Sequence, residues 1–228
     1  MARKVALAST TAFIALLIFA IAWSGCKREG ATGVAQTHLE EGGRALDAGD
    51  WSRARDAFTS AIETNDQLIE AFYGRAAATL AQAEEHYKLA QAAATMSDVD
   101  RGETEAQRAD VLFDETKQDC DAALGLDPDF SEAYFIKGVV AQYQGAWNEG
   151  IEAFTECLRV DPNRAEAYHR RGEIYDHIGD YINSTVDFKK AGELGFVKKD
   201  DAQDSPQLDE DDLSDLKYDA DENANNEE

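Results

Sequence analysis

A recurrence of residue types at a spacing of 34 constrains the fold of this chain more than any other feature of its sequence. Five pairs of like residues meet at this spacing: Tyr134 and Tyr168, Gly138 and Gly172, Gly145 and Gly179, Trp147 and Tyr181, and Phe154 and Phe188. Asp127-Pro128 and Asp161-Pro162 recur at the same spacing, and proline marks a point where one helix stops and another begins. A period of this length predicts an array of helical units that bury their apolar faces against one another.

Positions related by the repeat period are called columns here. The same columns continue towards the N-terminus with one interruption. Gly49, Asp50 and Trp51 precede Gly145 and Trp147 by 96 residues, which is two periods of 34 plus 28. One unit between them therefore carries an insertion of 28 residues.

The insertion falls in the second unit, at about residues 83–110. Its composition is rich in Ala, Glu and Gln, which favours helix, with a turn expected at 97–102. Divided equally, it would lengthen both helices of the unit by about 14 residues, or roughly 21 Å. Ala83, Tyr87, Ala90 and Ala94 fall on one face, which favours close antiparallel packing. The insertion is then either a passive elongation or a dedicated docking arm.

The pattern resembles the tetratricopeptide repeat, and the resemblance covers residues 35–198 in about four units: 35–68, 69–130, 131–164 and 165–198. It implies an all-α solenoid of helical hairpins with an elongated second hairpin. His38 in the first unit and Cys120 in the second depart from the aromatic columns.

Local residue chemistry accounts for the helix ends in these units. Gly49, Gly145 and Gly179 suit the left-handed conformation that ends the first helix of a pair. Asp50 and Asp180 follow directly and are expected to cap the second helix.

The N-terminal residues 1–26 form a membrane-directed segment. Arg3 and Lys4 precede a run of 19 uncharged, mostly apolar residues from Val5 to Trp23. As a helix this run would measure about 28 Å, close to the hydrocarbon thickness of a bilayer.

Two interpretations of this segment stay open. Ser24-Gly25-Cys26 resembles a bacterial lipoprotein signal, which implies lipidation of Cys26 and cleavage before it. The second interpretation is an uncleaved transmembrane anchor. In the lipoprotein signal the residue three before the cysteine is usually aliphatic, whereas here it is Trp23, which suits an aromatic position at the membrane interface. Both predict that a linker at 27–34 follows this segment and that the body is exported to the extracytoplasmic face of a bacterial cell envelope.

The charge of the chain is strongly negative and unevenly placed. The formal net charge is -24, which disfavours nucleic acid as a partner. Residues 199–228 hold thirteen acidic side chains against Lys199 and Lys217, and few large apolar ones. Such a segment cannot offset the entropy of ordering itself, so an acidic disordered tail is expected.

The sequence offers no catalytic constellation, and we expect a protein that is not an enzyme, with no cofactor, no metal and no small-molecule substrate. His169, Glu173 and His177 share one helix, where a solvated face is a simpler interpretation than a metal site. Cys120 and Cys157 occupy packing columns and are expected to be buried thiols, although a disulfide between them stays open.

The predicted function is that of a membrane-attached adaptor or scaffold that holds a protein or peptide in a concave groove. In the family resembled, the first helix of each pair lines that groove, which implies seven binding residues here: Tyr73, Phe135, Val139, Tyr143, His169, Glu173 and Asp176. An alternative for the aromatic members is packing against a neighbouring helix or against a second copy of the protein. More specific alternatives are a lipoprotein of envelope assembly, secretion or pilus biogenesis, and a regulatory domain associated with an enzyme.

Overall fold

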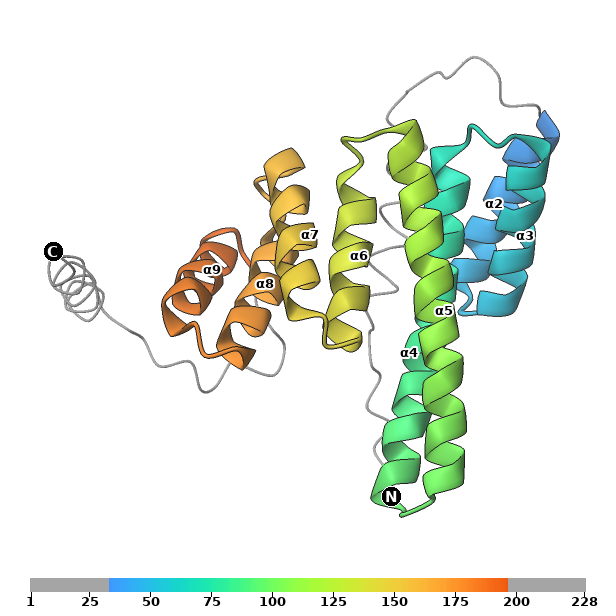
Figure 1. Cartoon of the computed structure of the whole chain (residues 1–228). Helices are drawn as coiled ribbons and strands as arrows, with labels where there is room; N and C mark the ends of the chain where they lie inside the picture. The colour runs from blue at the N-terminus through green and yellow to red at the C-terminus, as the bar shows by residue number, and fades with distance from the viewer. Residues whose placement is uncertain (1–32, 197–228) are drawn as a thin grey trace, which may run out of the picture. The chain divides into compact units, whose positions relative to one another are not determined.

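The computed structural model describes residues 33–196, and these residues form eight α-helices and no strand (Figure 1). The helices are α2 (Gly33–Asp47), α3 (Trp51–Thr64), α4 (Ile69–Thr95), α5 (Val99–Leu126), α6 (Ser131–Tyr143), α7 (Trp147–Val160), α8 (Ala165–His177) and α9 (Tyr181–Glu193). The prediction of an all-α fold is confirmed. The predicted membrane segment at 1–26 and the acidic tail at 199–228 lie outside the described residues.

Consecutive helices pair into four hairpins, α2 with α3, α4 with α5, α6 with α7 and α8 with α9. The Asp-Pro pairs mark helix ends as expected, because α5 ends just before Asp127 and α7 just before Asp161. The chain divides after Asp161 into two compact units. The first unit contains α2 to α7, and the second contains α8 and α9.

A contact between glycine and phenylalanine sets the close approach of helices in the first unit. Phe58 of α3 is fully buried, and a Cβ atom on Gly42 of α2 would lie 2.6 Å from its ring. Phe154 of α7 repeats this arrangement, with 2.7 Å to a Cβ on Gly138 of α6. The recurring glycine column therefore exists because the facing aromatic ring occupies the space of a side chain.

The predicted helix ends are confirmed. Gly49, Gly145 and Gly179 have φ values of 73°, 69° and 83°, in the left-handed region that glycine adopts without strain. The side chains of Asp50 and Asp180 each accept a hydrogen bond of 3.2 Å from the backbone N–H of the third residue of the following helix, Arg53 and Asn183 respectively. Both aspartates thus satisfy a donor that the helix leaves without a partner.

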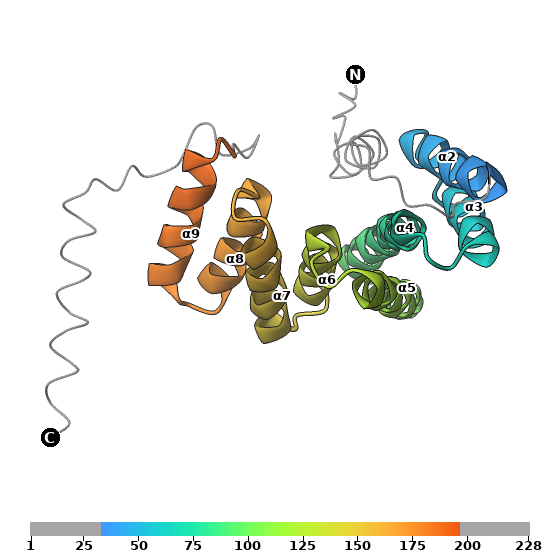
Figure 2. The same ribbon diagram turned by 90° about the horizontal axis from the view of Figure 1, so that it is seen from above.

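The second hairpin is elongated, as the insertion predicts. Helix α4 has 27 residues and α5 has 28, and the pair extends beyond α2, α3 and α6 (Figure 1). Figure 2 shows the two helices nearly end-on and side by side.

The turn of this hairpin is shorter than the expected 97–102, because α5 already begins at Val99. Ser97 takes the left-handed conformation with φ 60°, and Asp98 caps α5 by accepting from the N–H of Arg101. The buried alanine at the tip is Ala93 and not Ala94, and Gly102 packs beside it.

Candidate partner-binding surfaces

Three of the predicted binding residues in the first unit are buried. Tyr73, Phe135 and Val139 are 3%, 5% and 3% exposed. The ring of Tyr73 meets Phe130 edge-on with centroids 5.5 Å apart, and Phe135 meets Phe154 in the same way at 5.7 Å. The expectation that these side chains offer an open apolar surface is therefore corrected: in this structure their area contributes to packing.

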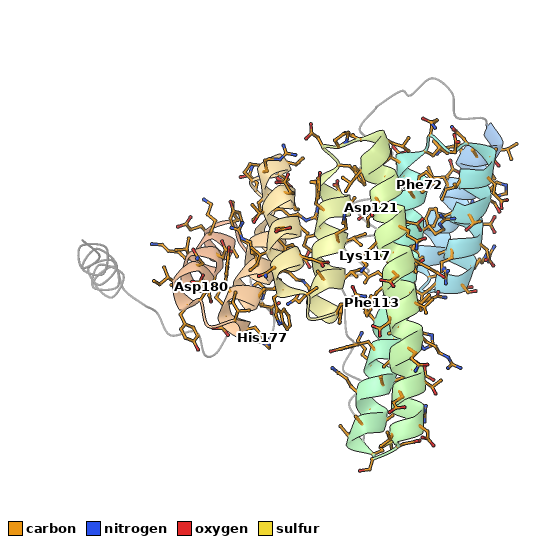
Figure 3. The ribbon with its side chains drawn as sticks, viewed as in Figure 1. Phe72, Phe113, Lys117, Asp121, His177 and Asp180 are labelled. Atoms are coloured by element: carbon orange, nitrogen blue, oxygen red, sulfur yellow. The ribbon has the colours of Figure 1, made fainter. Side chains whose placement is uncertain are left out.

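Tyr143 is half-buried between two aromatic rings of the elongated hairpin. Tyr87 of α4 contacts it edge-on at 5.1 Å, and Phe113 of α5 stacks on it at 5.3 Å with 16° between the planes. Figure 3 shows Phe113 on the side of α5 that borders α6. These contacts fit the alternative that the aromatic residues pack against a neighbouring helix. They pack α6 against the α4–α5 hairpin.

The predicted residues of the second unit lie on α8 and differ in exposure. The His169 ring stacks on Phe196 at 4.4 Å, and its Nε2 atom lies 3.3 Å from Oε1 of Glu173. Asp176 is exposed, one turn further along. Glu173 and Asp176 thus place negative charge at the end of α8.

The seven predicted residues are divided between the two compact units. Tyr73, Phe135, Val139 and Tyr143 belong to the first unit, whereas His169, Glu173 and Asp176 belong to the second. Each set is therefore a separate candidate surface.

A polar groove in the first unit was not predicted from the sequence. It encloses about 220 Å³ between α3, α4 and α5 and is lined by Arg55, Thr59, Arg75, Thr79, Glu115, Gln118 and Asp119. Arg75 donates to both carboxylate oxygens of Asp119, at 2.9 and 2.6 Å. Arg55 donates to Glu115 at 2.6 Å and to Gln82 at 2.7 Å.

The two arginines of this groove are already neutralised by carboxylates. The hydrogen bonds to Asp119 raise the pKa of Arg75 above its ordinary value, although burial acts in the opposite direction. Paired guanidinium groups attract an anion weakly, so the groove suits neutral hydrogen-bonding groups better than a phosphate or carboxylate.

The repeat columns contain a signal that would have located this pair. Arg75 and Asp119 occupy the columns of Arg171 and Asp187, and the latter two also form a double hydrogen bond, at 2.7 and 2.8 Å. Arg171 has its pKa raised by Asp187 in the same manner. Comparison of charged columns, and not only of apolar ones, would have revealed the ion pair.

Other sites considered from the sequence have plain structural roles. Cys120 and Cys157 are buried free thiols, and burial raises the pKa of the Cys120 thiol well above its ordinary range. Within residues 33–196, no group of three His, Cys, Asp or Glu side chains is placed to hold a metal ion. In that same span, no helix has the length and apolar character needed to cross a membrane.

Comparison with known proteins finds one repeat family in the C-terminal part of the described chain. A family model described as a tetratricopeptide repeat matches residues 165–194, which contain α8 and α9. The match therefore places a tetratricopeptide repeat in α8 and α9, and the hairpins of the first unit share the 34-residue columns of this segment.

A curated relative that carries this repeat in its name resembles part of the chain. A TPR repeat-containing protein of Methanocaldococcus jannaschii is 33% identical over 79 residues, which cover 35% of this chain. That match spans only 24% of the relative's length.

The solved structures support the fold. The TPR domain of Arabidopsis OM64 has a TM-score of 0.50 and 21% identity, over 65% of this chain and 99% of that domain. A crystal structure of MamA has a TM-score of 0.53 and 19% identity, over 70% of this chain and 77% of that chain. At these identities the likeness establishes the arrangement of helices alone.

Proposed function

We propose that this chain is a membrane-attached adaptor that binds a partner protein through exposed surfaces of its helical hairpins and catalyses no reaction. The observation that carries the proposal is the α4–α5 hairpin, which extends beyond the neighbouring hairpins of its unit. Its tip presents Met96 and Val99, which are 77% and 63% exposed. Exposed apolar residues at the tip of an elongated hairpin favour a docking role over passive elongation.

The charge of the body indicates the chemistry of the partner. Residues 29–198 carry a net charge of -17, and Asp176 with Glu173 adds a local negative site on α8. A partner segment with apolar anchors and basic residues suits both features. Envelope assembly, secretion or pilus biogenesis is the process we propose, with regulation of an enzyme as the second candidate.

We predict that the tip of the α4–α5 hairpin contacts the partner directly. A photo-reactive amino acid at Met96 or Val99 of the full chain in membranes should form a covalent adduct with a partner. The matched control is the same amino acid at Val34, which is 59% exposed at the start of α2. Adducts of equal yield from all three positions would indicate chance proximity and contradict the proposal.

The same photo-adduct at Met96 tests whether α8 of the second unit also binds the partner. Glu173→Lys/Asp176→Lys should lower adduct yield at Met96 if the partner's basic residues bind α8, because the reversed charges repel them. An undiminished adduct yield at Met96 would limit the proposed binding surface to the α4–α5 hairpin.

Membrane attachment gives a further prediction, motivated by Arg3, Lys4, the apolar run and Cys26. Cells supplied with a labelled fatty acid should label the protein, and Cys26→Ser should abolish the label. A membrane protein that is neither labelled nor processed would indicate the transmembrane anchor, and a product free in the cytosol would contradict both forms of attachment.

A further inference from the structure

Thr79 carries a buried hydroxyl that has no hydrogen-bond partner within residues 33–196. It lies on α4, is 1% exposed and lines the polar groove where α3 and α5 both pack on α4. Thr116 of α5 is equally buried, but its hydroxyl donates to the carbonyl oxygen of Leu112 at 2.8 Å. A buried hydroxyl without a partner is destabilising, so the Thr79 hydroxyl indicates a hydrogen-bonding group that enters the groove from outside.

The repeat itself does not require a polar residue at this position. Ala141 of α6 follows Thr79 by one period of 34 residues plus the insertion of 28, and it is 3% exposed. An alanine therefore fills the same column of the next hairpin. The hydroxyl of Thr79 is a feature of this groove and not of the packing that the repeats share.

The side chains around Thr79 keep unused donors and acceptors. Oε2 of Glu115 accepts from Arg55, and within the described chain no donor meets its Oε1. Gln118 is exposed, lines the groove and forms no hydrogen bond to any residue of 33–196. Thr79 and Gln118 therefore offer donors, and Glu115 and Gln118 offer acceptors.

The charges of the groove select a neutral ligand group. Arg55 pairs with Glu115 at 2.6 Å. Arg75 pairs with Asp119 at 2.6 Å as well. An anion would meet the two carboxylates and a cation would meet the two guanidinium groups, so the cost of desolvating a charged ligand is not offset.

The size of the groove indicates a single side chain. Its volume of about 220 Å³ is below the roughly 300 to 1,000 Å³ of pockets that enclose drug-sized ligands. A primary carboxamide has two N–H donors and a carbonyl acceptor at the end of a short apolar stem, so it can reach Thr79 from the opening. A main-chain amide is flanked by chain on both sides and does not reach a floor that is 1% exposed.

We propose that this groove binds an asparagine or glutamine side chain of a partner protein. The carbonyl oxygen of this side chain accepts from the Thr79 hydroxyl, and its N–H groups donate to Glu115 and Gln118. This contact surface is separate from the tip of the α4–α5 hairpin, and it rests on the proposed function only in taking a protein as the source of the side chain.

Methyl NMR of the full chain in detergent tests the proposal. Isotope-labelled threonine methyl groups provide two reporters in the groove, Thr59 and Thr79. The probe is N-acetyl-glutamine methylamide. The glutamate analogue has nearly the same shape with a negative charge, and the alanine analogue keeps both main-chain amides but lacks the side-chain one. We expect saturable shifts of both reporters with the glutamine probe, at an affinity about fivefold or more above that of either analogue.

The variant Thr79→Val should weaken binding of the glutamine probe by about three- to tenfold, because it removes one hydrogen bond and keeps the shape of the side chain. Thr59 remains as the reporter in this variant. The matched control is Thr116→Val, which removes an equally buried hydroxyl from outside the groove and should leave the affinity unchanged.

A second variant changes the selectivity of the groove and not its floor. The Glu115 side chain is 44% exposed, so Glu115→Gln should preserve the fold. It removes the carboxylate that neutralises Arg55, so the preference for the glutamine probe over the glutamate analogue should fall by about fivefold or more.

Equal affinities for the glutamine and alanine probes, or no shift with any probe, would overturn the proposal. An unaltered preference in Glu115→Gln would also contradict it. The measurement needs no partner protein, so this proposal can fail while adducts at the tip of the hairpin still form.

Discussion

Phe154→Ala should lower the free energy of unfolding of the first unit by about 3 to 5 kcal/mol, the range for truncation of a buried aromatic side chain. The Phe154 ring is fully buried, and it contacts Phe135 at 5.7 Å and fills the space opposite Gly138. Truncation removes these contacts and leaves a cavity between α6 and α7. Denaturant unfolding followed by circular dichroism measures the change.

The control for this experiment is Val111→Ala, in the same unit. Val111 is 59% exposed, so its truncation should change the free energy of unfolding by no more than about 0.5 kcal/mol. A loss below about 1 kcal/mol for Phe154→Ala would show that the ring is not part of a packed core.

Gly138→Ala should also destabilise the first unit, by about 1 to 3 kcal/mol, although alanine is the better helix former. A Cβ atom at this position would lie 2.7 Å from Cε1 of Phe154 and 2.8 Å from two further ring atoms. Because the ring is enclosed on all sides, relief requires the helices to separate.

Gly43→Ala provides a matched control with the opposite sign. Gly43 also lies inside a helix, but nothing approaches its Cβ position within 4 Å. Alanine there should stabilise the protein by about 0.5 to 1 kcal/mol. Equal effects of the two substitutions would contradict the role assigned to the glycine column.

The contact between Gly138 and Phe154 also explains why the repeats are visible in the sequence. The sequence shows glycine and phenylalanine in fixed columns, and the structure shows that these columns face each other across one hairpin. Three of the four described hairpins pair the same two residue types, Gly42 with Phe58, Gly138 with Phe154 and Gly172 with Phe188, whereas the second hairpin has Cys120 in the phenylalanine column.

Part of the predicted site could not be obtained from the sequence. Tyr73, Phe135 and Tyr143 were placed on a groove because the first helix of a pair lines it in the family resembled. Their aromatic contacts with Phe130, Phe154 and Phe113 join residues from different helices, and such contacts depend on how the helices approach one another. A helical period fixes the face on which a residue lies, but not what covers that face.

The sequence by itself determined the all-α class, the repeat period, the position of the insertion and the ends of several helices. These features depend on local physics: glycine permits positive φ, aspartate caps a helix and proline interrupts one. Only the tertiary structure decided that three predicted binding residues are buried, that Arg75 pairs with Asp119 and that a polar groove lies between α3, α4 and α5. Burial and ion pairing join residues far apart in the chain, so they follow from the packing of the helices and not from any one segment.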